Sequence, residues 1–252
     1  MPAPLPVIEV QTQVGSLLAH RDDEVITDNL IRWGVWEARE TQFLRELLRP
    51  GDTFVDVGAN IGYFSVLAAG CTGSDGYVIA FEPEPRNLEL LRMNLARHGI
   101  VANAVVFPVA AYSRPCWMAL AMNEANRGDH VLAPHASSGL RVRCVRLDDV
   151  LPGSVDVVKI DTQGFDHDVL AGLSKTIAAN PALVVLTELS LTKLGERGID
   201  VDEVLAGYLA RGFGIEALDA WGAPFPLAAA DVVTQCVANA TDEISLVLRR
   251  AR

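Results

Sequence analysis

Lysine is scarce in this chain of 252 residues. Its lysines are Lys159, Lys175 and Lys193, and the other basic residues are arginines. Acidic residues outnumber basic ones by 32 to 21, which gives a formal net charge of −11 at pH 7. Proteins that bind nucleic acids or anionic membranes present a basic surface. The charge balance therefore argues against a nucleic-acid partner and against a membrane partner.

Paired cysteines, long apolar runs and a secretory leader are also missing. Cys71, Cys116, Cys144 and Cys236 lie far apart and form no C-x-x-C pair, so we expect free thiols rather than disulfides or zinc ligands. No apolar run reaches the roughly 18 residues of a membrane helix. The first residues, Met1-Pro2-Ala3-Pro4, have no basic region followed by an apolar core. These absences predict a cytoplasmic protein.

The dinucleotide fingerprint G-x-G-x-x-G is absent, but a related pattern follows an apolar strand at 53–57. The turn reads Asp56-Val57-Gly58-Ala59-Asn60-Ile61-Gly62, and a second strand at 77–81 ends in Glu82. Glycines let the backbone approach a ligand closely, and an acid at the tip of the second strand can accept hydrogen bonds from ribose hydroxyls. The pattern therefore indicates a site for a cofactor that carries adenosine.

The position of Asp56 bears on which cofactor this is. An acid two residues before the first glycine suits a cationic amino-acid group better than a pyrophosphate, which favours S-adenosylmethionine over NAD. The sequence also lacks the Tyr-x-x-x-Lys pair of many hydride-transfer enzymes. An ordinary strand-to-helix turn with incidental glycines is the simplest competing interpretation.

The composition fits one globular domain, because half of the residues are hydrophobic and 21% are charged. We expect a single domain over 1–252, with an N-terminal arm and helix in about 1–50 and a core in about 51–252. The residues before Ile31 predict an irregular arm. The spacing of apolar residues predicts a helix over 36–48, which Pro50-Gly51 ends.

Strand-like and helix-like segments alternate through the rest of the chain. Strands are predicted at 53–57, 77–81, 105–107, 155–161, 182–188, 213–218 and 244–248, and helices at about 60–69, 85–98, 167–173 and 202–211. The segments 117–122 and 140–147 predict an inserted hairpin with a long loop at 123–139. This alternation predicts an α/β fold with a mostly parallel sheet and helices on both faces.

Four acids follow or end predicted strands: Asp56, Glu82, Asp161 and Glu188. Ligands of open α/β sheets bind beyond the carboxyl ends of the strands. Carboxylates buried at scattered places would each need compensation, so four on one rim indicate a site. Taken singly, each could equally cap a helix or face solvent.

Several motifs in order along the chain resemble the FkbM-type S-adenosylmethionine-dependent methyltransferases. They are residues 49–64, Phe81-Glu82-Pro83-Glu84-Pro85, 146–150 and 158–164, together with Glu37. The resemblance covers about 33–190. It implies a class I methyltransferase Rossmann-like fold with a seven-stranded sheet whose last strand is antiparallel. Gln163 departs from the family pattern, because many relatives carry an acid there.

The resemblance and the rim together suggest roles at the cofactor. Glu82 is expected to bind the ribose diol, and Gly58, Asn60 and Gly62 to line the ribose and methionine portions. Asp56 either orients the turn or meets the amino group through water. Glu37 binds the ammonium, helps to close the pocket or is a solvated helix residue. Ala110 and Ala111, after the third strand, are expected to flank the adenine.

Three residues are candidates for the group that accepts the proton, and the sequence does not decide between them. Asp161 ends the fourth strand and is the first choice for a site role; it is also assigned to the cofactor site. His167 could accept a hydroxyl proton or merely cap a helix, and Glu188 is the third candidate. Asp161 and Glu188 could instead hold Mg²⁺ with water, but this is not favoured, and no metal ligand is assigned.

The inserted loop offers further candidates. Arg127 could meet an anionic or polyhydroxylated substrate, and His130 and His135 could touch substrate, although solvated loop residues explain them equally well. The apolar helix with Trp33 and Trp36 could pack on a second copy of the chain as easily as on its own sheet, so a homo-oligomer is one of the alternatives.

The predicted function is S-adenosylmethionine-dependent O-methylation of a small hydroxylated acceptor, such as a sugar or polyketide, in natural-product biosynthesis. The alternatives are an NAD-dependent oxidoreductase and a non-catalytic cofactor-binding scaffold.

Overall fold

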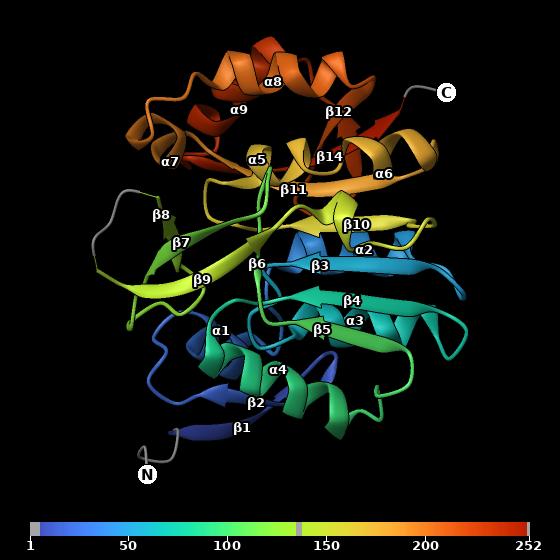
Figure 1. Cartoon of the computed structure of the whole chain (residues 1–252), viewed down its shortest axis with the longest axis vertical. Coiled ribbons are helices and arrows are strands. Elements are labelled where there is room, and N and C mark those ends of the chain that lie inside the picture. The colour runs from blue at the N-terminus through green and yellow to red at the C-terminus, as the bar shows by residue number, and fades with distance from the viewer. Residues whose placement is uncertain (1–5, 135–137, 251–252) are drawn as a thin grey trace.

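A computed structural model describes residues 6–134 and 138–250 (Figure 1). Its centre is an eight-stranded sheet in the order β13-β12-β14-β11-β10-β3-β4-β5. The strands, in chain order, are β3 (Thr53–Val57), β4 (Tyr77–Phe81), β5 (Ala104–Phe107), β10 (Val157–Ile160), β11 (Val184–Ser190), β12 (Phe213–Leu218), β13 (Pro224–Pro226) and β14 (Glu243–Arg250). Each strand predicted for this sheet from the sequence is present.

The directions of the strands confirm a mostly parallel sheet with an antiparallel last strand. β3, β4, β5, β10 and β11 form parallel pairs, whereas β14 lies antiparallel between β11 and β12. The predicted number of seven strands is wrong by one, because β13 adds a short edge strand beside β12. Two of its three residues are prolines, which cannot donate hydrogen bonds to a ladder, so this segment carries no strand signal in its sequence.

Helices cover both faces of the sheet, as the alternation predicted. Because side chains alternate across a strand, Phe54 packs into one apolar core and Val55 into the other. The first core includes α1 (Ile26–Trp33), α2 (Ala38–Leu47), α3 (Tyr63–Thr72) and α4 (Pro85–Arg97). The second includes α5 (Asp166–Ala171), α6 (Ser174–Ala179), α7 (Leu191–Glu196), α8 (Val201–Ala210) and α9 (Val232–Ala238).

The predicted irregular arm before Ile31 is wrong. This segment forms an antiparallel hairpin, β1 (Val7–Thr12) and β2 (Gly15–His20), followed by α1. The side chain of Asn94 on α4 fixes β2: its Oδ1 accepts a hydrogen bond from the Leu18 N–H at 2.7 Å, and its Nδ2 donates to the Leu18 carbonyl at 2.9 Å. Contacts with a helix that is distant in the sequence thus determine this hairpin, and local sequence patterns do not report such contacts.

The predicted inserted hairpin is present and is part of a larger unit. β7 (Cys116–Ala121) pairs antiparallel with β9 (Leu140–Val145), and the short strands β6 (Ala110–Ala111) and β8 (Val131–Ala133) complete a four-stranded sheet in the order β6-β9-β7-β8. A small apolar core joins this sheet to Phe165, which precedes α5. We call this unit the inserted sheet.

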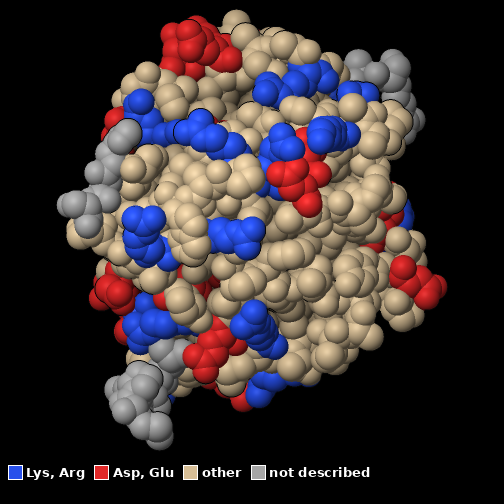
Figure 2. Space-filling model, in the orientation of Figure 1, with Lys and Arg blue, Asp and Glu red and all other residues tan. Residues whose placement is uncertain are grey.

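Charged side chains are interspersed on the face of the molecule that Figure 2 shows, where basic and acidic groups lie among broad uncharged areas. All four cysteines are free thiols, as predicted. Within 6–134 and 138–250, no helix combines the length and the apolar character needed to cross a bilayer.

Candidate active site

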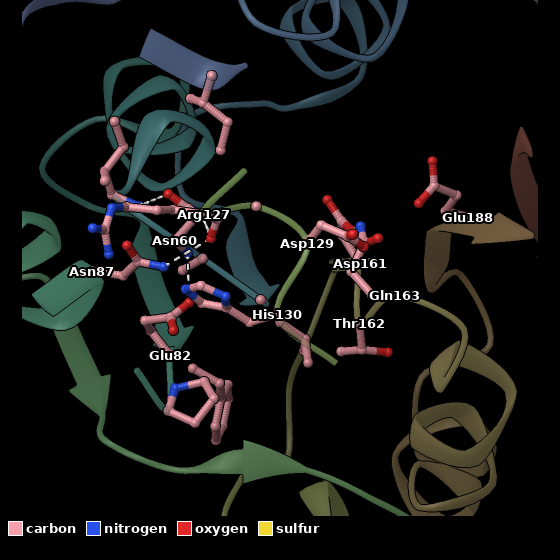
Figure 3. A pocket seen from close by; sticks show the side chains of 18 of the residues that line it. Asn60, Glu82, Asn87, Arg127, Asp129, His130, Asp161, Thr162, Gln163 and Glu188 are labelled. Atoms are coloured by element: carbon pink, nitrogen blue, oxygen red, sulfur yellow. Dashed lines mark hydrogen bonds between the residues drawn. The ribbon is translucent and has the colours of Figure 1, made fainter. Parts of the chain in front are cut away.

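A cavity of about 390 Å³ lies beyond the carboxyl ends of β3, β4 and β10. The chain leaves β3 toward β4 on one side, while β10 lies on its other side, so the strand order reverses here. Such reversal points are where α/β sheets bind ligands. Figure 3 shows two groups of side chains in this first cavity: Asn60, Glu82 and His130 in one, and Asp161, Gln163 and Glu188 in the other. We call these the Glu82 end and the Asp161 end.

The glycine turn brings the ends of β3 and β10 into contact. Gly58 has a φ of 84°, and a Cβ atom there would lie 2.0 Å from the carbonyl oxygen of Asp161. Gly62 has a φ of 90°, and a Cβ atom there would lie 2.6 Å from Cδ1 of Leu91 on α4. Both positions therefore require glycine for conformation and for space.

Glu82 is fixed in place at its end of the cavity. Its carboxylate accepts hydrogen bonds from the backbone N–H groups of Asn60 and Glu84, each at 2.8 Å, and the residue is 5% exposed. Burial raises the pKa of Glu82 to about 8, although both N–H donors act to lower it. The remaining lone pairs of the two oxygens can accept hydrogen bonds from a ligand that enters the cavity.

Small and apolar side chains line the wall near Glu82. Ala110 and Ala111 of β6 lie on the cavity wall together with Phe81, Pro83 and Val109. Ala110 pairs with Cys144 of β9, so the inserted sheet holds this wall in place. The wall has the apolar character that a flat heterocycle requires.

A buried lysine organises the Asp161 end. The Nζ of Lys159 lies 3.0 Å from Oδ2 of Asp161, 3.5 Å from Oε2 of Glu37 and 4.4 Å from the ring centre of Phe64. Burial acts to lower the pKa of Lys159, but the carboxylates of Asp161, Glu37 and Asp56 raise it above its usual value. Lys159 is therefore a permanent cation.

Glu37 faces Lys159 from the start of α2, with a φ of 42°. Burial raises the pKa of Glu37 to about 8, Lys159 acts in the opposite direction, and Asp161 raises the value further. Glu37 lines the cavity and so is not the solvated helix residue that the sequence allowed.

Asp161 is held by a second donor besides Lys159. Nε2 of Gln163 donates to its Oδ1 at 2.8 Å, and Gln163 has a φ of 55°. Oε1 of Gln163 in turn accepts from Nζ of Lys193, which also pairs with Oδ1 of Asp129. This chain of contacts joins α7, the turn after β10 and the inserted sheet at the cavity wall.

Three of the predicted site residues lie outside the wall of the first cavity: Asp56, Gly62 and His167. Asp56 is 1% exposed, and its Oδ2 accepts from the hydroxyl of Ser65 at 2.6 Å, so it orients the start of α3. Burial raises its pKa to about 6. His167 instead lies beside Asp168, with Nε2 at 3.3 Å from Oδ2, and lines a small pocket next to Tyr208.

Arg127 anchors the inserted loop rather than facing the cavity with its charge. Its guanidinium pairs with Asp22 at 3.0 Å and Glu124 at 2.7 Å, while its carbonyl accepts from Nδ2 of Asn60 and of Asn87. Figure 3 shows this segment beside Glu82. The loop is thus attached to both the glycine turn and α4.

His130 lies on the cavity wall, with its Nδ1 accepting from the Asn123 N–H at 3.0 Å. Burial lowers the pKa of His130. His135, the other loop histidine considered, is outside the described residues.

The described residues contain no group of three or more His, Cys, Asp or Glu side chains placed to hold a metal ion. Both oxygens of Asp161 already accept hydrogen bonds, from Lys159 and Gln163. Ion pairs and hydrogen bonds between described residues hold the side chains at the Asp161 end of the cavity.

Among the residues on the cavity wall that were not assigned a role from the sequence are Lys159, Lys193 and Glu243. Lys159 had a usable signal, because a single cation inside the apolar strand Val157–Ile160 implies a buried ion pair. Lys193 and Glu243 had no such signal in the sequence, because they lie on α7 and β14, which follow the recognised motifs in the chain.

Comparisons with known proteins identify the family of the chain. Residues 56–215, more than half of the chain, match the family described as the methyltransferase FkbM domain. The 31-O-demethyl-FK506 methyltransferase FkbM of Streptomyces tacrolimicus is 31% identical over a region that covers 50% of this chain and 61% of that protein. This chain therefore spans less than two thirds of the length of that relative.

Two solved structures share the fold at low sequence identity. The methyltransferase FkbM from Methylobacillus flagellatus KT is 16% identical with a TM-score of 0.51, and the match covers 83% of this chain and 50% of that chain. An S-adenosylmethionine-dependent O-methyltransferase from Thermotoga maritima is 14% identical with a TM-score of 0.51, covering 98% and 79%. The fold is that of the class I methyltransferases. Within this class, the chain belongs to the FkbM methyltransferase family.

Proposed function

We propose that this chain is an S-adenosylmethionine-dependent O-methyltransferase that acts on a small hydroxylated metabolite. The observation that carries the proposal is the division of the first cavity into an end where the fixed Glu82 carboxylate lies beside an apolar wall and an Asp161 end lined by paired charges. S-adenosylmethionine has the same division, with adenosine at one end and a charged amino-acid group at the other.

The residues at each end fit this cofactor. Glu82 offers two oriented oxygens to the ribose hydroxyls, and Ala110 and Ala111 leave room for adenine. Glu37 suits the ammonium group, and Lys159 suits the carboxylate. The missing Cβ of Gly58 allows close packing of the turn below the ligand. Nothing in the comparisons supports the NAD-dependent alternative.

A second cavity of about 400 Å³ supports a site for the methyl acceptor. It shares Trp36, Glu37, Lys159, Asp161, Glu188 and Glu243 with the wall of the first cavity, and it continues past Thr187 and Ser245. Its polar lining suits a hydroxylated molecule. The name of the Streptomyces relative, which specifies a 31-O-demethyl compound, supports oxygen as the acceptor atom.

The protein's contribution to the chemistry follows from these positions. Bound S-adenosylmethionine supplies an electrophilic methyl group. The protein has to align the acceptor hydroxyl with that group, exclude water and remove the hydroxyl proton. Lys159 and Gln163 hold Asp161 in one orientation, so Asp161 suits positioning of the acceptor or cofactor.

Ligand binding and transfer of a labelled methyl group test the proposal. S-adenosylhomocysteine is expected to raise the melting temperature of the protein, whereas NADH is not. Incubation with methyl-labelled S-adenosylmethionine and a panel of sugars, polyketides and other hydroxylated metabolites is expected to yield a labelled ether. Stabilisation by NADH alone would contradict the cofactor assignment. Cofactor binding with no labelled product from any acceptor would favour the non-catalytic scaffold.

A further inference from the structure

Glu188 and Glu243 lie together where the two cavities meet. Glu188 pairs with Ser245 across the antiparallel strands β11 and β14, and Glu243 pairs with Ser190, two residues further along. Residues two apart on a strand point to the same face, so the two side chains are diagonal neighbours. Both residues line both cavities.

The negative charge of Glu243 adds to the rise in the pKa of Glu188, as expected for two acids at diagonal positions on the wall of one cavity. Two ionised carboxylates so placed repel each other and have only acceptors, so a proton taken up by one of them relieves the repulsion and supplies a donor. Burial raises the pKa of Glu188 well above its usual value, and the negative charges of Asp161, Glu37, Glu243 and Asp166 add to this. The pair therefore resembles other carboxyl pairs that share one proton.

The groups around Glu188 and Glu243 favour protonation of the pair. Burial also raises the pKa of Glu243; Lys193 opposes the rise, while Asp242 and Asp161 add to it. Across the described chain, neither Glu188 nor Glu243 lies within 4.0 Å of a cationic nitrogen, in contrast to Asp161. Figure 3 shows the side chain of Glu188 across the cavity from Glu82, near Asp161.

We infer that Glu188 and Glu243 together hold one proton and accept a second one from the acceptor hydroxyl during methyl transfer. The inference rests on the proposed function. The oxygen lone pair forms the new O–CH₃ bond, and the S–CH₃ bond breaks with its electrons moving to sulfur, which becomes a neutral thioether. The hydroxyl proton passes to the singly protonated pair, which becomes neutral. Charge is balanced, because one cation and one anion disappear together.

A titration of the carboxyl groups in the full chain tests the shared proton without cofactor or acceptor. Glutamate labelled with ¹³C at the side-chain carboxyl is observed by NMR, and the spectra of Glu188→Gln and Glu243→Gln assign the two signals. In the unsubstituted protein we expect two coupled steps, one of them well above the ordinary glutamate pKa of about 4.3. In Glu243→Gln, the pKa of Glu188 should fall, because a neighbouring negative charge is lost. Glu89→Gln, on the exposed face of α4, is the matched control and should change neither signal.

Independent titration of both groups near 4.3, unchanged when the other is substituted, would overturn the inference. Thermal unfolding of each variant shows whether it is folded. With an acceptor that the labelled panel identifies, each glutamine variant should lose about 10²–10⁴-fold in kcat, with S-adenosylhomocysteine affinity unchanged. Full activity in both variants would overturn the base role. If the titration shows a shared proton but no acceptor in the panel is methylated, the proposed function is contradicted, and the conclusion that Glu188 and Glu243 share a proton remains.

Discussion

The two ends of the first cavity are built in different ways. At the Glu82 end, the Glu82 carboxylate is held by one short part of the chain, in which the turn after β3 and the end of β4 bind each other through hydrogen bonds of the backbone. The Asp161 end combines Glu37, Lys159, Glu188 and Glu243, which are widely separated in the sequence. The first end is held by backbone geometry and the second by balanced charges. Substitutions at the two ends should therefore fail in different ways.

The largest effect is expected from Lys159→Met. This change removes the cation between Asp161 and Glu37 and leaves buried carboxylates without compensation. Breaking a buried ion pair by removing one partner costs about 3–5 kcal/mol. Denaturant unfolding should show this loss of free energy of unfolding, whereas Lys175→Met, at an exposed position, should change it little. Equal stability of the two variants would contradict the central role of Lys159.

Gly58→Ala tests the backbone geometry near the other end. A left-handed conformation costs a non-glycine residue about 1–2 kcal/mol, and overpacking adds about 1–3 kcal/mol. Gly51→Ala is the matched control: Gly51 has a φ of 91°, but a Cβ atom there would meet no other atom within 4 Å, whereas at Gly58 it would lie 2.0 Å from the Asp161 carbonyl oxygen. Gly58→Ala should lower the free energy of unfolding by more than Gly51→Ala. An equal loss would show that the backbone near Asp161 moves away from a Cβ atom at position 58 at little cost in free energy.

Glu82→Ala should mainly weaken cofactor binding. It removes the oxygens that we assign to the ribose hydroxyls, and two hydrogen bonds at about 0.5–1.5 kcal/mol each together contribute about 1–3 kcal/mol. We expect affinity for S-adenosylhomocysteine to fall by about 10–100-fold in isothermal titration calorimetry. Glu89→Ala serves as the control. Unchanged affinity of Glu82→Ala would remove Glu82 from the ribose site.

The smallest effect on global stability is expected from Arg127→Met. Methionine keeps much of the buried volume, and the partners Asp22 and Glu124 are 45% and 65% exposed at their side chains. Pairs with exposed partners are worth about 0–1 kcal/mol. Hydrogen exchange should nevertheless quicken at residues 123–130, since this loop loses its anchor beside Glu82. Unchanged exchange there would show that the carbonyl contacts with Asn60 and Asn87 are sufficient.

Local patterns predicted much of the sheet and the glycine turn and acid that form part of the Glu82 end. The strands at 77–81 and 213–218 have the bounds predicted from the sequence, because their apolar runs are bounded by clear turn residues. The β1–β2 hairpin and the edge strand β13 were missed. Asn94 on a distant helix fixes the hairpin, and prolines remove the strand signal from β13.

The sequence by itself determined the class of fold and the Glu82 end of the site. Glycine conformation, strand alternation and an acid at a strand tip act over a few residues, so they can be read in order along the chain. Only the tertiary structure decided the Asp161 end. It placed Glu37 and Asp161 around Lys159, brought Glu188 and Glu243 to diagonal positions on neighbouring strands, and left His167 outside the first cavity. The physical reason is that burial and opposing charges set the state of an acid, and both depend on residues that only folding brings together.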